Sequence, residues 1–253
     1  TIFHQPQQKL TVQIGCRQEI AHQVGMPLVT NFRMQDVLLG GQGAPLVPFG
    51  DHVLYGHYEA ALNLGGFANA SIGNPRLKDG VARALDICPL NIVMNELATE
   101  LGADYDKDGA WARAGKANQW ALEELNSLEF YDRKHEHSLG YEWVRESVLP
   151  LIDYLGPTDS LATMVEHAVI QISEVLGTRQ TLVSGGGAFN SFLIDRLRME
   201  NINLEVPDAQ TINSKEAVVF ALLGHHRFFG LNNVLGETTG SGISHSSGCI
   251  YMP

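Results

Sequence analysis

Cysteine is scarce in this sequence and follows no recognised metal or disulfide spacing. The 253 residues include three cysteines, Cys16, Cys88 and Cys249, and no CxxC pair. This pattern predicts neither a disulfide framework nor a zinc site. Isolated free thiols are typical of a reducing compartment, so we expect a cytoplasmic protein.

Positive charge is also in short supply. The chain has 17 basic and 28 acidic residues, with a formal net charge of −11. Because there is no basic run, the sequence argues against binding to nucleic acid or to an anionic membrane surface. No uninterrupted apolar stretch is long enough to cross a bilayer. We therefore expect no nucleic-acid partner and no membrane partner.

Several catalytic motifs are missing as well. The ten histidines form no HExxH pair, and the chain has no GxSxG elbow, no lysine-bearing P-loop and no dinucleotide fingerprint. The composition, with 44% hydrophobic and 18% charged residues, is that of a globular protein with a substantial core. The chain opens without Met or a signal-peptide pattern, and we expect it to be part of a longer protein.

Strand and helix patterns alternate along the chain, which predicts an α/β fold with a domain boundary near residue 60. A loop rich in glycine and proline is expected at 38–50, and an irregular tail at 236–253. The helix expected at 214–229 has Ser214 as its N-cap. Strands are predicted at 10–14, 27–32, 60–64, 68–72, 180–184 and 203–206, and the other helices at 17–24, 92–101, 109–125, 141–155, 160–176 and 189–199.

Two glycine turns could contact phosphates. Residues 181–190 run from a strand through Gly185-Gly186-Gly187 into a helix, an arrangement in which backbone N–H groups and the helix dipole can bind an anion or nucleotide. A tight connection without a ligand explains the pattern equally well. Residues 62–69 predict a hairpin with Gly65-Gly66 at its tip, which suits phosphates but is also an ordinary hairpin turn.

Two polar segments could bind or activate a substrate. Asp86 precedes a predicted helix with a proline at its start, where a carboxylate could act as a general base, help hold a metal-bound phosphate or simply cap the helix. In the segment 32–48, Arg33, Asp36 and Gln42 lie among glycines and could bind a polyhydroxylated ligand. A structural surface loop is the alternative.

Together these segments resemble the anhydro-N-acetylmuramic acid kinase family, sugar kinases of peptidoglycan recycling. The run from Asn31 through Asp36 to Pro48 is similar to the family signature DFR…D…GGQGAPLVP. Thr1, His4 and Pro6 resemble its TxxHxP stretch. Further matches lie at 62–69, 105–115 and 183–190, so that the resemblance covers nearly the whole chain.

The resemblance implies a two-lobed, actin-like and hexokinase-like ATPase fold whose N-terminal part is missing. Residues 1–59 would be the remainder of the N-terminal lobe with the sugar-binding loop, and residues 60–253 the C-terminal lobe. ATP, Mg²⁺ and an amino sugar are the implied cofactors and substrate, and the implied assembly is a homodimer. Because the family's SGTSLDG phosphate loop is absent, the chain alone is expected to be inactive.

The resemblance also implies roles for single residues. Asp86 corresponds to the family's catalytic aspartate, which activates a water that opens the 1,6-anhydro ring while the freed O6 takes the γ-phosphoryl group of ATP. The product would be N-acetylmuramic acid 6-phosphate, and no residue is assigned to a metal. The implied ATP-binding residues are Gly65, Gly66, Asn69, Gly185, Gly186, Gly187 and Asn190, and the implied sugar-binding residues are Arg33, Asp36, Gln42 and Gly43.

Two positions depart from the family pattern. The family's DTGPxN is Asp86-Ile-Cys-Pro-Leu-Asn91 here, and Asn31 replaces the aspartate of DFR. Two alternatives therefore stay open beside the family reaction. The chain could serve a kinase for a related amino sugar, or it could be a non-catalytic paralogue that binds a nucleotide or a sugar.

Overall fold

The structure, a computed structural model, describes residues 1–73, 81–132 and 139–253. The chain forms two compact units. The second unit comprises 58–71 and 85–213, and the first unit comprises 1–57, 72–84 and 214–253. The first change of unit, after His57, lies near the predicted boundary. That the units are the N-terminal and C-terminal lobes of a kinase stays a prediction.

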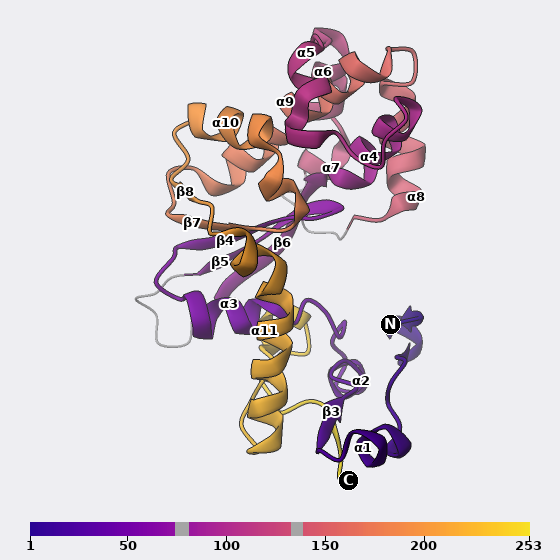
Figure 1. The fold of residues 1–253 in the computed structure, drawn as a ribbon, viewed down its shortest axis with the longest axis vertical. Coiled ribbons are helices and arrows are strands. Elements are labelled where there is room, and N and C mark those ends of the chain that lie inside the picture. Colours follow the sequence, from indigo (N-terminus) through magenta and orange to yellow (C-terminus); the bar gives the residue numbers. More distant parts are fainter. Residues whose placement is uncertain (74–80, 133–138) are drawn as a thin grey trace. The chain divides into compact units, whose positions relative to one another are not determined.

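A five-stranded sheet forms the centre of the second unit, with the strand order β6-β5-β4-β7-β8 (Figure 1). The parallel pair β4 and β7 aligns Leu62 with Val183 and Asn63 with Ser184. Both strands are almost wholly buried, as expected for parallel strands covered on both faces. With helices packed around this sheet, the predicted α/β class is confirmed. The strands are β4 (Ala60–Leu64), β5 (Phe67–Gly73), β6 (Val81–Pro89), β7 (Thr181–Ser184) and β8 (Leu204–Glu205).

Helix α9 (Pro157–Leu176) is the central helix of the second unit. Most of its residues are buried, and helices α4, α5, α6 and α10 all pack on it (Figure 1). A helix that is apolar on nearly every side needs neighbours all around it, which explains this arrangement. The other helices are α4 (Asn91–Glu100), η2 (Lys107–Gly109), α5 (Ala110–Ala114), α6 (Gln119–Asn126), α7 (Glu129–Asp132), α8 (Tyr141–Trp143), η3 (Val144–Val148), η4 (Leu149–Leu151), η5 (Gly186–Phe189) and α10 (Ser191–Met199).

A chain of polar groups joins α6 and α7 to the buried side of α9. His167 is fully buried, and its Nδ1 lies 2.7 Å from Asn126 Oδ1 while its Nε2 lies 2.8 Å from the hydroxyl of Tyr131. Gln171 donates to the same Asn126 oxygen at 2.9 Å. Since an amide oxygen only accepts, Nδ1 carries the proton and Nε2 accepts from Tyr131. The neutral imidazole is therefore fully hydrogen-bonded, and burial lowers the pKa of His167 to about 3.

This histidine predicts a loss of stability in mild acid. Because its pKa falls from 6.5 in the unfolded chain to about 3 in the fold, only the unfolded chain binds the proton between these values. Its contribution is complete above pH 6.5 and should fall by about 2 kcal/mol on going from pH 7.5 to pH 5. Urea unfolding at both pH values, with natural protein and His167→Gln, measures this difference. Equal pH dependence in the two proteins would contradict the assignment.

The first unit has a core between α3 (Val47–Tyr55) and α11 (Ala209–Phe228). Across it, Lys215 Nζ lies 2.7 Å from Asp51 Oδ1, and both side chains are buried. Two short sheets, β1-β2 and β3-β9, complete this unit. The apolar core residues are Phe32, Leu46, Phe49, Val219, Leu223 and Val234. The remaining elements are β1 (Phe3–Gln5), η1 (Pro6–Gln8), β2 (Leu10–Val12), α1 (Gln18–Val24), β3 (Leu28–Thr30), α2 (Met34–Leu38), α12 (Gly236–Thr239) and β9 (Cys249–Tyr251).

Several expected elements have different bounds. The predicted loop at 38–50 was wrong in its last part, since α3 begins at Val47 with Pro48 in its first turn, a position where the missing N–H costs nothing. Ser214 is not an N-cap, because α11 begins at Ala209 and the Asp208 carboxylate accepts from Thr211 N at 2.9 Å. The tail is not wholly irregular: it contains α12 and β9.

Two helices predicted to be continuous are broken. The expected helix at 109–125 is divided at Gly115, whose backbone is extended, and restarts after Asn118, whose side chain accepts from Ala121 N. The expected helix at 141–155 passes from α8 into the π-helix η3 and the 3-10 helix η4, where Pro150 has no N–H for an α-helical bond. None of the helices within the described ranges is long and apolar enough to span a membrane.

Candidate functional site

The predicted hairpin and the start of α4 form one structure in the second unit. Strands β4 and β5 are neighbours in the sheet and are joined by Gly65-Gly66, as predicted. The carbonyl of Gly66 accepts from Leu90 N at 2.9 Å and from Ile92 N at 3.0 Å. In addition, Asn91 donates from its side chain to Leu64 O at 3.0 Å. The hairpin tip is thereby fixed against the first residues of α4, a role for Asn91 that the sequence analysis missed.

The second glycine turn packs directly on this hairpin. Gly185 has φ 84° and ψ 166°, a conformation that essentially only glycine adopts. A Cβ atom there would lie 2.5 Å from Asn63 Oδ1 and 2.8 Å from the carbonyl carbon of Leu64. At Gly187 a Cβ would lie 2.8 Å from the Cβ of Leu64. The structure thus brings the two predicted phosphate-binding turns together on one unit.

The two predicted asparagines have different surroundings. Asn190 caps α10, since its Oδ1 accepts from Leu193 N at 3.0 Å, and it lies against Gly109. The helix predicted at 189–199 therefore begins at Ser191. Asn69 is half-buried in β5 and alternates with two buried alanines, so its side chain is on the opposite face of that strand.

The sequence suggested that Asp86 comes immediately before a helix. In the structure Asp86 lies inside strand β6. Its Oδ2 accepts from Leu139 N at 2.9 Å, and the carboxylate is half-buried. Leu90, the residue directly after β6, is bonded to Gly66, and the four residue steps from Asp86 to Leu90 place Asp86 roughly 13 Å from the hairpin tip. A ligand that contacts both must span that length. Next to Asp86, Ile87 and Cys88 are fully buried, and burial raises the pKa of the Cys88 thiol far above its usual range.

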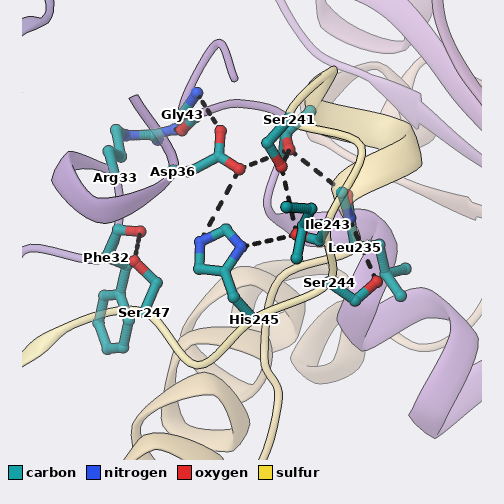
Figure 2. A network of polar contacts seen from close by, with 12 residues as sticks. Phe32, Arg33, Asp36, Gly43, Leu235, Ser241, Ile243, Ser244, His245 and Ser247 are labelled. Carbon is teal, nitrogen blue, oxygen red and sulfur yellow. Dashed lines mark hydrogen bonds and ion pairs between the residues drawn. The ribbon is translucent and has the colours of Figure 1, made fainter. Parts of the chain in front are cut away.

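The predicted sugar-binding residues come together in the first unit around one pair of peptide groups. Gly43 N donates to Asp36 Oδ2 at 2.7 Å, and Gly43 O accepts from Arg33 Nη1 at 2.7 Å (Figure 2). Gln42 N donates to Thr239 O at 2.7 Å, and Gln42 O lies 2.9 Å from Nε2 of His4. All four backbone groups of these two residues are therefore hydrogen-bonded. The side chain of Gln42 is exposed.

The four predicted sugar-binding residues differ in whether their side chains are engaged within the loop or exposed. Asp36 is fully buried, and its Oδ1 accepts from the hydroxyl of Thr239 at 2.6 Å. A Cβ on Gly41 would come within 2.2 Å of Asp36 Oδ2, so the loop needs glycine for this close approach. Partial burial lowers the pKa of Arg33, an effect that Glu216 opposes. Asp36 and Arg33 hold the loop, whereas the side chain of Gln42 is exposed.

The sequence analysis left two contributors to this loop without a role. His4 was part of the TxxHxP match, but its contact with the carbonyl of Gln42 depends on the fold. Thr239 lies in the tail that was expected to be irregular. Their only signal in the sequence is a polar side chain in a matching or glycine-rich segment, which does not identify a partner 38 residues away for His4 or 203 residues away for Thr239.

No group of three or more metal-ligating side chains occurs among the residues that the structure describes. Magnesium in phosphoryl-transfer sites is commonly held by one or two carboxylates together with the substrate phosphates. Asp86, a half-buried carboxylate on the strand next to β5, is a side chain of this type.

The comparisons with known proteins agree with this geometry. A family profile described as anhydro-N-acetylmuramic acid kinase matches residues 1–253. Relatives described by the same words are 36% identical in Aliivibrio fischeri and 35% identical in Pseudomonas paraeruginosa, each over 99% of this chain and 73% of the relative. A relative in Sulfurovum is 31% identical over 100% of this chain and 73% of the relative.

These matches define an enzyme of the kinase class, an ATP-dependent transferase. The chain belongs to the anhydro-N-acetylmuramic acid kinase family. The resemblance predicted from its motifs is thereby confirmed. Among solved structures, the activator of the 2-hydroxyisocaproyl-CoA dehydratase from Clostridium difficile with bound ADPNP gives a TM-score of 0.43 at 16% identity, over 70% of this chain and 64% of that chain.

Proposed function

We propose that this protein converts 1,6-anhydro-N-acetylmuramic acid to N-acetylmuramic acid 6-phosphate in peptidoglycan recycling. The observation that carries the proposal is the packing of two glycine turns and the start of α4 into one surface, in a chain of this kinase family. Backbone N–H groups at such turns suit the phosphates of ATP. We further propose that the protein is cytoplasmic, that it forms a homodimer, and that it adopts the two-lobed actin-like architecture.

In the proposed reaction Asp86 acts as a general base. Its carboxylate takes a proton from water, the water oxygen bonds to C1 of the sugar, and the bond from C1 to O6 breaks. The freed O6 then bonds to the γ-phosphorus of ATP while the bond to the β-phosphate oxygen breaks and ADP leaves. The N–H of Leu139 orients the carboxylate through its bond to Oδ2. A general base of this kind contributes about 10²–10⁴ in rate.

The remaining proposed residues bind the two substrates. Gly65, Gly66, Gly185, Gly186 and Gly187 offer backbone groups to ATP, while Asn69 and Asn190 flank them. Gln42 binds the sugar through its exposed side chain, on a loop held by Arg33, Asp36 and Gly43. Mg²⁺, bound with the ATP phosphates, would offset their negative charge.

The test is direct. The purified full-length protein, incubated with ATP, Mg²⁺ and 1,6-anhydro-N-acetylmuramic acid, should form ADP and N-acetylmuramic acid 6-phosphate in equal amounts. Performing the reaction in ¹⁸O-labelled water should place the label on C1, because water opens the ring. If the protein phosphorylates a different amino sugar but not 1,6-anhydro-N-acetylmuramic acid, the result would support the alternative of a kinase for a related amino sugar.

A non-catalytic paralogue is the second candidate, and one observation favours it. Ile87 and Cys88 stand where the family has a threonine and a glycine, and both side chains are fully buried, so neither offers a hydroxyl to a ligand. Tight ATP or sugar binding without any product would support this candidate. Product formation would exclude it.

A further inference from the structure

The segment 236–247 packs on the sugar loop, the loop at 32–48 of the first unit. Thr239, at the end of α12, is almost fully buried and bonds to the loop twice. Its carbonyl accepts from Gln42 N at 2.7 Å, and its hydroxyl donates to Asp36 Oδ1 at 2.6 Å. Because Asp36 in turn accepts from Gly43 N, Thr239 reaches two consecutive peptide groups of the loop by two routes.

His245 shows why the hydroxyl of Thr239 matters for Asp36. Its Nδ1 lies 2.8 Å from Ile243 O and so carries a proton. Nε2 is buried 3.9 Å from Asp36 Oδ1, and no residue within the described ranges hydrogen-bonds to it. At 3.9 Å this nitrogen is too far from the carboxylate oxygen for a hydrogen bond, so the ring does not substitute for the threonine hydroxyl. Without the threonine hydroxyl, this oxygen of a fully buried carboxylate would lose its short hydrogen bond.

We propose that Thr239 is a positioning residue for sugar binding, which acts on the ligand through Asp36 and the backbone of Gln42 and Gly43. The proposal rests on the proposed function of the loop, in which Gln42 binds the sugar. With its own N–H and carbonyl both bonded, Gln42 has a fixed backbone and an exposed side chain. A fixed backbone lowers the entropy lost when the side chain binds a sugar hydroxyl.

Thr239→Val tests this role, because valine keeps the shape of threonine and removes the hydroxyl. We expect the KM for the amino sugar to rise roughly tenfold, the factor that corresponds to one hydrogen bond to a buried charged group. The KM for ATP should not change, and kcat should change less than the sugar KM. Thr239→Ser should restore the sugar KM. Ser241→Ala is the matched control, since that hydroxyl contacts Thr239 and Ile243 without reaching Asp36.

Amide hydrogen exchange tests the same proposal without any activity. In Thr239→Val the amides of Gln42 and Gly43 should exchange roughly tenfold faster than in the natural protein, while Thr239→Ser and Ser241→Ala stay close to it. Unchanged exchange at both amides in Thr239→Val, or equal effects of the valine and serine variants, would overturn the proposal. If Thr239→Val does not fold, Thr239→Ala removes the hydroxyl without placing a methyl group beside the Asp36 carboxylate.

The two readouts separate this inference from the proposed function. If exchange responds as expected but no amino sugar is phosphorylated or bound, the loop is positioned by Thr239 and the proposed substrate is wrong. If the sugar is phosphorylated but Thr239→Val changes neither exchange nor the sugar KM, the reaction stands and the positioning role is wrong.

Discussion

We expect the Asp86→Asn variant to bind ATP as the natural protein does and to form the phosphorylated sugar at least about a hundredfold more slowly. Asparagine keeps the shape of the side chain, and its oxygen can still accept from Leu139 N, so the local structure should persist. The amide cannot take a proton from water, and the ring-opening step loses its base. Product formation and ATP affinity, measured side by side, separate these effects.

Asp153→Asn is the matched control for this experiment. Asp153 is an exposed carboxylate of the second unit, and its change removes the same charge away from the two glycine turns. The control should retain full activity. Normal turnover by Asp86→Asn would contradict the role of Asp86 as a base, whereas a loss of ATP binding would indicate that the carboxylate serves the nucleotide.

The second large effect is expected at Gly185. Gly185→Ala forces a side chain into a conformation that costs about 1–3 kcal/mol, and its Cβ would overlap the backbone of Leu64. Because the turn packs on the hairpin at this point, the variant should unfold at a lower urea concentration and lose ATP binding. Urea unfolding and ATP titration measure the two effects.

Gly186→Ala provides the comparison within the same turn. A Cβ at Gly186 meets only Asn91 Nδ2, at 4.0 Å, so the alanine fits and stability should stay within about 0.5 kcal/mol of the natural protein. Any weakening of ATP binding in this variant then reports contact between the nucleotide and the turn itself. Equal stability of the two alanine variants would contradict the close packing of Gly185 on Leu64.

The sequence predicted four of the five strands in the sheet of the second unit, because local signals and the fold agree there, but it did not predict β6 (Val81–Pro89). The buried strand at Ala60–Leu64, the Gly65-Gly66 turn and the strand before Gly185 combine an apolar run with glycine at its end. These signals depend on neighbouring residues alone. They predicted the positions of both glycine turns, and the family motif predicted the loop at 32–48, whose role in sugar binding stays a prediction.

Other elements could not be predicted because distant contacts decide them. Strand β9 is three residues long and exists by pairing with β3, which is more than 200 residues earlier. Helix α3 begins within a segment whose glycine and proline content predicts a loop, yet Gly50 is needed because its Cβ would lie 2.4 Å from Val219 of α11. The different surroundings of Asp36 and Gln42 could not be predicted either. The fold buries the side chain of Asp36 and exposes that of Gln42, and their spacing in the sequence does not indicate this difference.

The bond between Thr239 and Asp36 has a consequence for synthesis on the ribosome. Asp36 precedes the hydroxyl that satisfies its carboxylate by some 200 residues, and strand β3 precedes its partner β9 by a similar stretch. The nascent loop must therefore keep this carboxylate hydrated until that hydroxyl has emerged from the ribosome. A truncation that removes Thr239 should accordingly impair the loop around Asp36 and Gly43.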